Sequence, residues 1–162
     1  MKKINLLAVL VAGVFAVACN GGSNPPPPIV GLTTSFSDGS SSFDATTDTP
    51  VVTKVMTLLN NGESNVSQIA FTLPSNGYFD VTHDDTGTSP CTIHNQSITN
   101  TLVQNQYCTI KVTYNNATVT SSTSANIVFN YLYGLEAKIQ TTTVSYVTTS
   151  IPSNKVKYVA VG

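Results

Sequence analysis

Apolar and polar residues alternate along two stretches in the second half of the chain. In residues 107–114, one face holds Cys108, Ile110, Val112 and Tyr114, and the opposite face is mostly polar. In residues 125–133, one face holds Ile127, Phe129, Tyr131 and Tyr133, while the other holds Val128, Leu132 and two asparagines. Because successive side chains of a strand point to opposite sides, this two-residue period predicts two β-strands, the second covered in part on both faces.

Other segments give strand signals as well. Short apolar runs at residues 31–36, 51–59, 67–73, 78–82, 135–148 and 155–161 are separated by turn residues such as Asn60-Asn61-Gly62. We predict loops at residues 37–42, 44–50, 83–90 and 115–124, and an irregular segment at 93–102. With no 3.6-residue period outside the N-terminal segment, the pattern predicts an all-β fold, an antiparallel β-sandwich of about seven to nine strands.

The N-terminal segment has the pattern of a secretory signal. Two lysines are followed by an apolar stretch at residues 6–18, and small residues precede Cys19. The stretch has 13 residues, fewer than the roughly 20 that span a bilayer as a helix. Residues 1–18 are therefore predicted to be a signal peptide rather than a retained transmembrane anchor.

Cys19 is predicted to carry a lipid. The sequence Ala16-Val17-Ala18-Cys19 resembles the lipobox of bacterial lipoproteins, in which the cysteine is acylated and becomes the first residue after cleavage. Two or more acyl chains hold a protein stably on a membrane. The alternative is an ordinary signal peptide cleaved after Ala18, which would leave Cys19 as a free thiol.

A spacer is expected to follow the lipidated cysteine. Residues 19–28 combine a Gly/Ser segment with four prolines, a composition typical of an extended tether. Residues 29–162 then form the single predicted domain. By resemblance to the sorting rule of enteric bacteria, Asn20 indicates the outer membrane, so we expect a lipid-anchored protein of the bacterial cell envelope.

Composition excludes one class of partner. Without Lys2 and Lys3, the chain has five scattered lysines and eight acidic residues, which give it a formal charge of −3. It has no arginine. Nucleic-acid-binding proteins neutralise phosphates with clustered basic residues, so we expect no nucleic-acid partner. The hydrophobic fraction of 41% with only 9% charged residues indicates a folded chain rather than a disordered one.

With Cys19 assigned to the lipid, Cys91 and Cys108 remain as a pair. In an oxidising envelope compartment such a pair predicts a disulfide, which would contribute about 3 kcal/mol for a loop of this length. A metal site is the alternative, although the two thiolates lack the close spacing of zinc ligands.

The segment from about residue 51 to residue 133 is similar to the immunoglobulin-like domains of the abnormal-spindle and hydin type. The residues that carry the resemblance are Asn60-Asn61-Gly62, Phe71, Phe79, Cys91, Leu102, the strand Cys108-Thr109-Ile110-Lys111-Val112-Thr113-Tyr114, and Ile127-Val128-Phe129. The resemblance implies an immunoglobulin-like β-sandwich. It implies a binding or structural module and no chemistry, because a sandwich hosts many functions.

One polar cluster is a candidate cation site. It consists of Asp80, His83, Asp84 and Asp85, with His94 beyond Cys91, and a disulfide would bring these loops together. The spacing matches no calcium-loop template, and a solvated acidic turn is the simpler interpretation. No metal or other cofactor is therefore assigned.

Enzymatic chemistry finds no support in the sequence. The chain has no Gly-x-Ser-x-Gly motif, and lipidation and disulfide formation would leave no free thiol as a nucleophile.

Three functional hypotheses remain. The first is a non-catalytic envelope lipoprotein that docks onto another envelope protein. The second is a surface-exposed adhesin-like module. The third is a cation-dependent enzyme or binding protein centred on residues 80–94.

Overall fold

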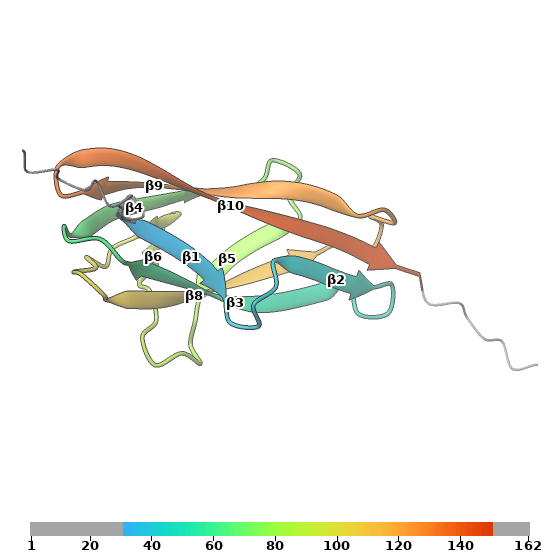
Figure 1. Ribbon diagram of the computed structural model, residues 1–162. Coiled ribbons are helices and arrows are strands. Elements are labelled where there is room, and N and C mark those ends of the chain that lie inside the picture. The colour runs from blue at the N-terminus through green and yellow to red at the C-terminus, as the bar shows by residue number, and fades with distance from the viewer. Residues whose placement is uncertain (1–30, 151–162) are drawn as a thin grey trace, which may run out of the picture.

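The computed structural model describes residues 31–150 as two β-sheets that pack face to face (Figure 1). The strands are β1 (Leu32–Phe36), β2 (Ser42–Thr46), β3 (Val51–Asn60), β4 (Val66–Thr72), β5 (Phe79–His83), β6 (Ile93–His94), β7 (Ser97–Ile98), β8 (Tyr107–Asn115), β9 (Thr123–Tyr133) and β10 (Glu136–Thr149). One sheet has the order β1-β3-β8-β5, and the other has the order β2-β10-β9-β4-β7-β6. The predicted all-β sandwich is confirmed.

The two strongest alternating segments form central strands, one in each sheet. On β8, Cys108, Ile110, Val112 and Tyr114 are buried, as the two-residue period predicts. On β9, Ile127, Phe129 and Tyr131 are buried, and Val128 and Leu132 on the opposite face are half-buried. A strand with neighbours on both edges and the second sheet beneath it must supply apolar side chains to the core, which is why its pattern is so regular.

Aromatic rings fill the centre of the sandwich. The ring of Phe79 lies 5.5 Å from that of Phe43, 5.4 Å from that of Tyr114 and 5.2 Å from that of Tyr146, measured between centroids. The Phe43 and Tyr146 contacts are edge-to-face, the arrangement that the charge distribution of aromatic rings favours. The buried Tyr114 hydroxyl lies 3.1 Å from that of Thr148. Rings from both sheets therefore join the two layers.

The structure contains strands that the sequence pattern did not predict. β2 falls where loops were predicted at 37–42 and 44–50, and the short β6–β7 hairpin falls in the segment predicted to be irregular. β2 also runs parallel to β10, so the sandwich is not antiparallel throughout. Its five residues include only Phe43 and Ala45 as core positions, too few for a clear alternation. The strand predicted at 155–161 lies outside the described residues.

The predicted disulfide between Cys91 and Cys108 is confirmed. The two Cα atoms are 4.9 Å apart, and both residues are buried. The bond connects the segment before β6 to the central strand β8 and closes the loop between them. Around it, Cys91 N donates to Thr109 O at 2.8 Å, and Thr109 N donates to Ser89 O at 2.8 Å. The segment is thus fixed to β8 by backbone hydrogen bonds as well as by the disulfide.

The chain enters the described part at one end of the sandwich, which we call the near end. The near end consists of Gly31 and residues 60–66, 102–106 and 133–136. Asn61 N donates to Gly31 O at 3.2 Å, and Val66 pairs with both Tyr133 and Leu102. Figure 1 shows the start of β1 beside the β9–β10 turn at this end, whereas β2 and the end of β10 lie at the opposite, far end.

Residues 31–150 contain no helix that is long and apolar enough to cross a membrane.

Candidate functional site

A β-bulge distorts β4 beside its neighbour β9. Ser67 pairs with Leu132 and Ala70 pairs with Asn130, so two residues of β4 lie opposite one residue of β9. Gln68, the first of the two, has a φ of 51°. A residue with a side chain rarely adopts this left-handed conformation, and bulges often redirect side chains next to binding sites. The bulge turns Gln68 to solvent.

The hairpin of β6 and β7 packs on the edge of the same strand. Asn95 and Gln96 connect the two strands with φ values of 47° and 60°, the conformation of a tight hairpin turn with both central residues left-handed. Gln96 O accepts a hydrogen bond from Phe71 N at 2.9 Å, which continues the ladder along β4.

The chain makes a further turn at the near end. Gln106 N donates to Val103 O at 2.9 Å, and Asn105 between them has a φ of 62°. Within the described residues, Gln68, Asn95, Gln96 and Asn105 are the non-glycine residues with positive φ. All four thus belong to β4 or to the segment that the disulfide closes. Such conformations concentrate at functional sites, where the surrounding structure holds them.

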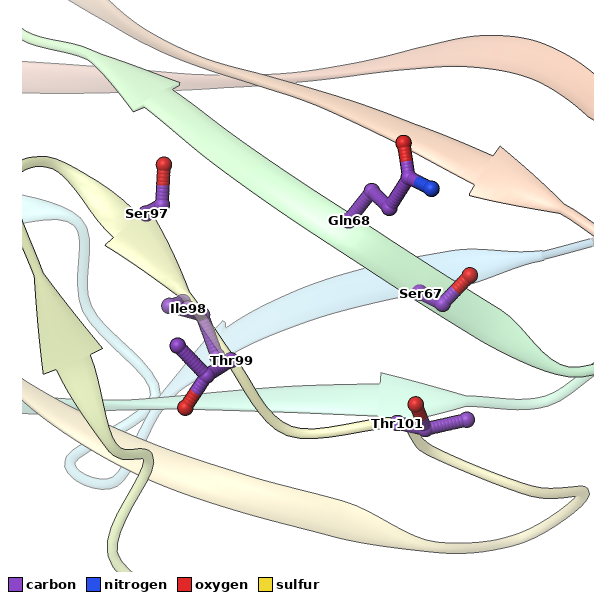
Figure 2. A pocket seen from close by; sticks show the side chains of 6 residues that line it. All are labelled: Ser67, Gln68, Ser97, Ile98, Thr99 and Thr101. Carbon is purple, nitrogen blue, oxygen red and sulfur yellow. The ribbon is translucent and has the colours of Figure 1, made fainter.

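Two depressions open between these elements. The first has a volume of about 700 Å³ and is lined by Ser67, Gln68, Ser97, Ile98, Thr99 and Thr101. Figure 2 shows it as the gap between β4, which carries Ser67 and Gln68, and the chain that leaves β7. The second, of about 290 Å³, is lined by Thr101 together with Ser89, Asn100, Leu102, Asn105, Gln106 and Tyr107. We call the residues that line either depression the neutral corner, because none of them carries a charge.

Two amide groups of the corner are oriented by the backbone. Asn100 Oδ1 accepts from Thr92 N at 2.6 Å, and Gln106 Oε1 accepts from Val103 N at 3.3 Å. With these two side-chain oxygens engaged by the protein, the NH₂ groups of Asn100 and Gln106 are the ends left to bond a partner. The corner therefore offers oriented amide donors and hydroxyl groups beside the half-exposed ring of Tyr107. It is suited to hydrogen bonding with an uncharged partner and carries no acid, base or metal ligand set.

Asn60 supports the corner from beneath. It is fully buried at the end of β3, and its side-chain NH₂ donates to Ser64 O and to Leu102 O, each at 2.8 Å. Its side-chain oxygen accepts from Gly62 N at 3.0 Å. Backbone bonds from Asn60 N to Gln106 O and from Asn105 N to Asn60 O complete the connection. One asparagine thus fixes the 102–106 turn to the four-stranded sheet.

Among the cation candidates, Asp84 is a buried structural residue. Its Oδ1 accepts from Thr86 N at 3.2 Å and from Thr86 Oγ1 at 2.8 Å. Hydrogen bonding from the Thr109 hydroxyl, and then from the Thr86 hydroxyl, lowers the pKa of the Asp84 carboxyl. A Cβ on Gly87 would lie 2.4 Å from Asp84 Oδ2, so the loop is wrapped closely around this carboxylate.

The other cation candidates are engaged separately. Asp85 forms an exposed ion pair with Lys111, which lowers the pKa of the Asp85 carboxyl. Asp80 Oδ1 accepts from Val81 N, and His83 Nδ1 lies 2.8 Å from Cys91 O. His94 is exposed on β6. In the part of the chain that the structure describes, no three His, Cys, Asp or Glu side chains are grouped so that they could hold a metal ion. Cys19 lies outside this part.

The lining of the neutral corner was not singled out by sequence reasoning, which sought charged and sulfur-containing groups. One signal was nevertheless present. From residue 86 to residue 110 the chain has no Asp, Glu, Lys or Arg, and hydroxyl and amide residues predominate. An uncharged polar run of this length that includes two cysteines is a pattern expected of an ordered, hydrogen-bonding loop.

Comparisons with known proteins concern the fold alone. No protein-family profile and no curated protein match the sequence. Among solved structures, the Vibrio cholerae VesB protease is similar over 73% of this chain and 32% of its own, with 16% identity and a TM-score of 0.49. This chain thus spans about a third of that protease.

Two smaller structures are also similar. An ASH / PapD-like domain of human CEP192 has 11% identity and a TM-score of 0.46, covering 93% of this chain and 98% of its own. The periplasmic chaperone SfaE has 10% identity and a TM-score of 0.45, covering 75% of this chain and 60% of its own. Membership of the abnormal-spindle and hydin family stays a prediction. The fold of this protein is a two-sheet β-sandwich with one disulfide, and PapD-like domains are among the solved structures similar to it.

Proposed function

We propose that this protein is a lipid-anchored component of the bacterial envelope that docks onto another envelope protein through the neutral corner, without catalysis. Cys19 would carry the lipid, and residues 20–30 would link it to the sandwich. The corner provides hydroxyl and amide groups and no general base or nucleophile system, which supports a binding role rather than an enzymatic one.

The position of the corner is the observation that carries the proposal. Leu102, Asn105 and Gln106 line the second depression and belong to the near end, where the chain from Cys19 enters the sandwich. A partner held in or on the same membrane would meet this end first. An adhesin that captures ligands away from the membrane would be expected to have its binding site at the far end. The location of the corner at the near end therefore favours docking over adhesion.

The chemistry of the corner indicates the kind of partner. Exposed amide donors pair with backbone carbonyl groups and with hydroxyl or amide side chains of a second protein. Because the lining is uncharged, association should depend little on ionic strength, in contrast to an interface steered by opposite charges. Tyr107, 44% exposed, adds the aromatic surface that interfaces commonly contain.

The proposal is tested by crosslinking the full-length protein in cells, followed by extraction in mild detergent and purification. Thr101→Arg places a long cation where the two depressions meet, and it should reduce partner recovery at least tenfold. Ser122→Arg makes the same change at an exposed position of the far end, and it should leave recovery unchanged. Equal recovery with both variants would contradict docking through the corner.

The anchor is tested separately with Cys19→Ser. This variant should lose acyl labelling and should leave the membrane fraction, because the thiol that carries the lipid is gone. Acyl labelling that persists in Cys19→Ser would refute the assignment of Cys19, whatever the outcome at the corner.

A further inference from the structure

The most exposed large apolar residue of the described chain is at the tip of the β9–β10 hairpin. Leu135 is 97% exposed, and it occupies the two-residue connection between Tyr133 and Glu136, which pair with each other. Gly134 precedes it with a φ of 61°, so the turn itself needs the glycine and has no need of an apolar neighbour. Polar residues usually fill such turns, and the core gains nothing from this leucine.

The tip is held firmly at the point where the chain enters. Gly134 N donates to Asn65 O at 2.8 Å. The Tyr133 hydroxyl accepts from Glu63 N at 2.7 Å and from Ser64 N at 3.0 Å. Leu32 N donates to the Tyr131 hydroxyl at 3.2 Å. These bonds fix the position of Leu135 relative to the first described residues, and Figure 1 shows the turn beside the start of β1.

The length of the preceding chain limits how far this end can move from a membrane. Eleven residues separate Cys19 from Gly31, and a chain of that length spans at most about 40 Å when fully extended. A lipid on Cys19 would therefore keep the near end within this distance of the bilayer. Tethering also raises the effective concentration of the tip at the surface, so that a small apolar group suffices for contact.

Other groups at this end are compatible with a lipid surface. Val103 is 42% exposed on the neighbouring segment. The carboxylate of Glu136 is paired with Lys138 Nζ at 2.8 Å, which reduces the charge beside the tip. Glu63 is exposed at the same end, so a zwitterionic surface suits it better than an anionic one.

We infer that Leu135 inserts into the headgroup region of the bilayer that holds the lipid on Cys19, and that the sandwich is thereby seated with its near end on the membrane. This inference rests on the proposed lipid anchor. Seating would orient the neutral corner toward partners in the same membrane and leave the far end projecting from it.

The absence of tryptophan from the chain makes a direct test possible. Leu135→Trp and Val51→Trp each introduce a single tryptophan, which can be excited selectively over tyrosine, into the full-length, lipidated protein. Val51, 50% exposed, lies at the far end, where β3 begins, and provides the matched control. Each protein is reconstituted into phosphatidylcholine vesicles with or without brominated acyl chains, and vesicle flotation reports the anchor independently.

Seating predicts that the tryptophan at position 135 emits at shorter wavelength and is quenched by brominated lipid at least three times more strongly than the one at position 51. Adding Cys19→Ser should return its emission to that of a solvent-exposed tryptophan. Equal quenching in vesicles that do carry the protein would overturn seating alone. Failure of both proteins to float would overturn the anchor, and seating with it.

Discussion

Asn60 shows how one buried polar residue can organise a surface that it does not reach. It follows Met56 and Leu58 on the inward face of β3, so a position that would ordinarily be apolar is occupied by an amide. Its burial is compatible with folding because both ends of the amide are hydrogen-bonded. In the sequence it looked like an ordinary turn residue, and only the structure shows that its partners include residue 102.

Asn60→Asp should therefore be strongly destabilising. The carboxylate can still accept from Gly62 N, but it cannot donate to the carbonyl groups of Ser64 and Leu102, which would face a negative charge. Losing two buried hydrogen bonds costs at least about 2 kcal/mol, measurable as a lower urea midpoint for residues 29–162. Asn65→Asp, at an exposed position, is the matched control. A loss no larger than that of the control would show that the Asn60 side chain does not hold the near end together.

Asp84 should make stability depend on acid pH. Its pKa is lowered in the folded protein from an ordinary value of 3.8, so the unfolded chain binds a proton more readily than the folded one. The resulting stabilisation is complete above about pH 5 and is lost as the pH falls through the lowered folded value. Asp84→Asn removes this titration, and its unfolding free energy should fall less steeply between pH 5 and pH 2. Parallel curves for the two proteins would contradict the role given to Asp84.

At the scale of elements, the sequence predicts those strands that have apolar residues at every second position. β8 and β9 have them because each is flanked by strands on both sides and covered by the other sheet. β2 does not, since two core residues in a five-residue strand leave a pattern dominated by serine, threonine and aspartate. Its partner β10 is also about a hundred residues away in the chain, and no local pattern encodes a pairing of that kind.

Glycine substitutions in and near the β6–β7 turn are expected to change the stability of the domain in opposite directions. Gln96 has a φ of 60°, which glycine adopts without steric cost. Gln96→Gly should stabilise the domain by about 0.5 kcal/mol, because relief of the left-handed conformation outweighs the greater freedom of the unfolded chain. Gln104→Gly, where φ is not positive, should destabilise it by a similar amount. Thermal unfolding of both variants measures the difference, and a decrease for both would show that Gln96 is not strained.

At the scale of the whole molecule, the disulfide is the covalent crosslink that lies beside the neutral corner. It closes the segment that carries both the β6–β7 hairpin and most of the lining. The cysteines and the general fold were predictable, because their spacing and the alternation of β8 are local features. The neutral corner was not predictable from the sequence. It forms where a bulge in β4 meets a loop some thirty residues later in the chain, and none of its hydroxyl and amide residues is distinctive by itself.

Replacing both cysteines, in the Cys91→Ala/Cys108→Ala variant, should lower the unfolding free energy by about 3 kcal/mol. The effect arises largely because the unfolded chain regains the freedom that the crosslink removed. Amide hydrogen exchange should accelerate most between residues 92 and 107 and least in β9. Uniform acceleration across all strands would indicate that the bond stabilises the sandwich as a whole rather than this segment.

The crosslink also has a consequence for when the protein can bind. A nascent chain in the reducing cytosol keeps Cys91 and Cys108 as thiols, and its lining segment is then free of covalent restraint at both ends. In the proposed envelope lipoprotein, oxidation would follow only after export. If the neutral corner is the docking surface, it would be completed by this oxidation step, and the chain would not associate with a partner during synthesis and transport.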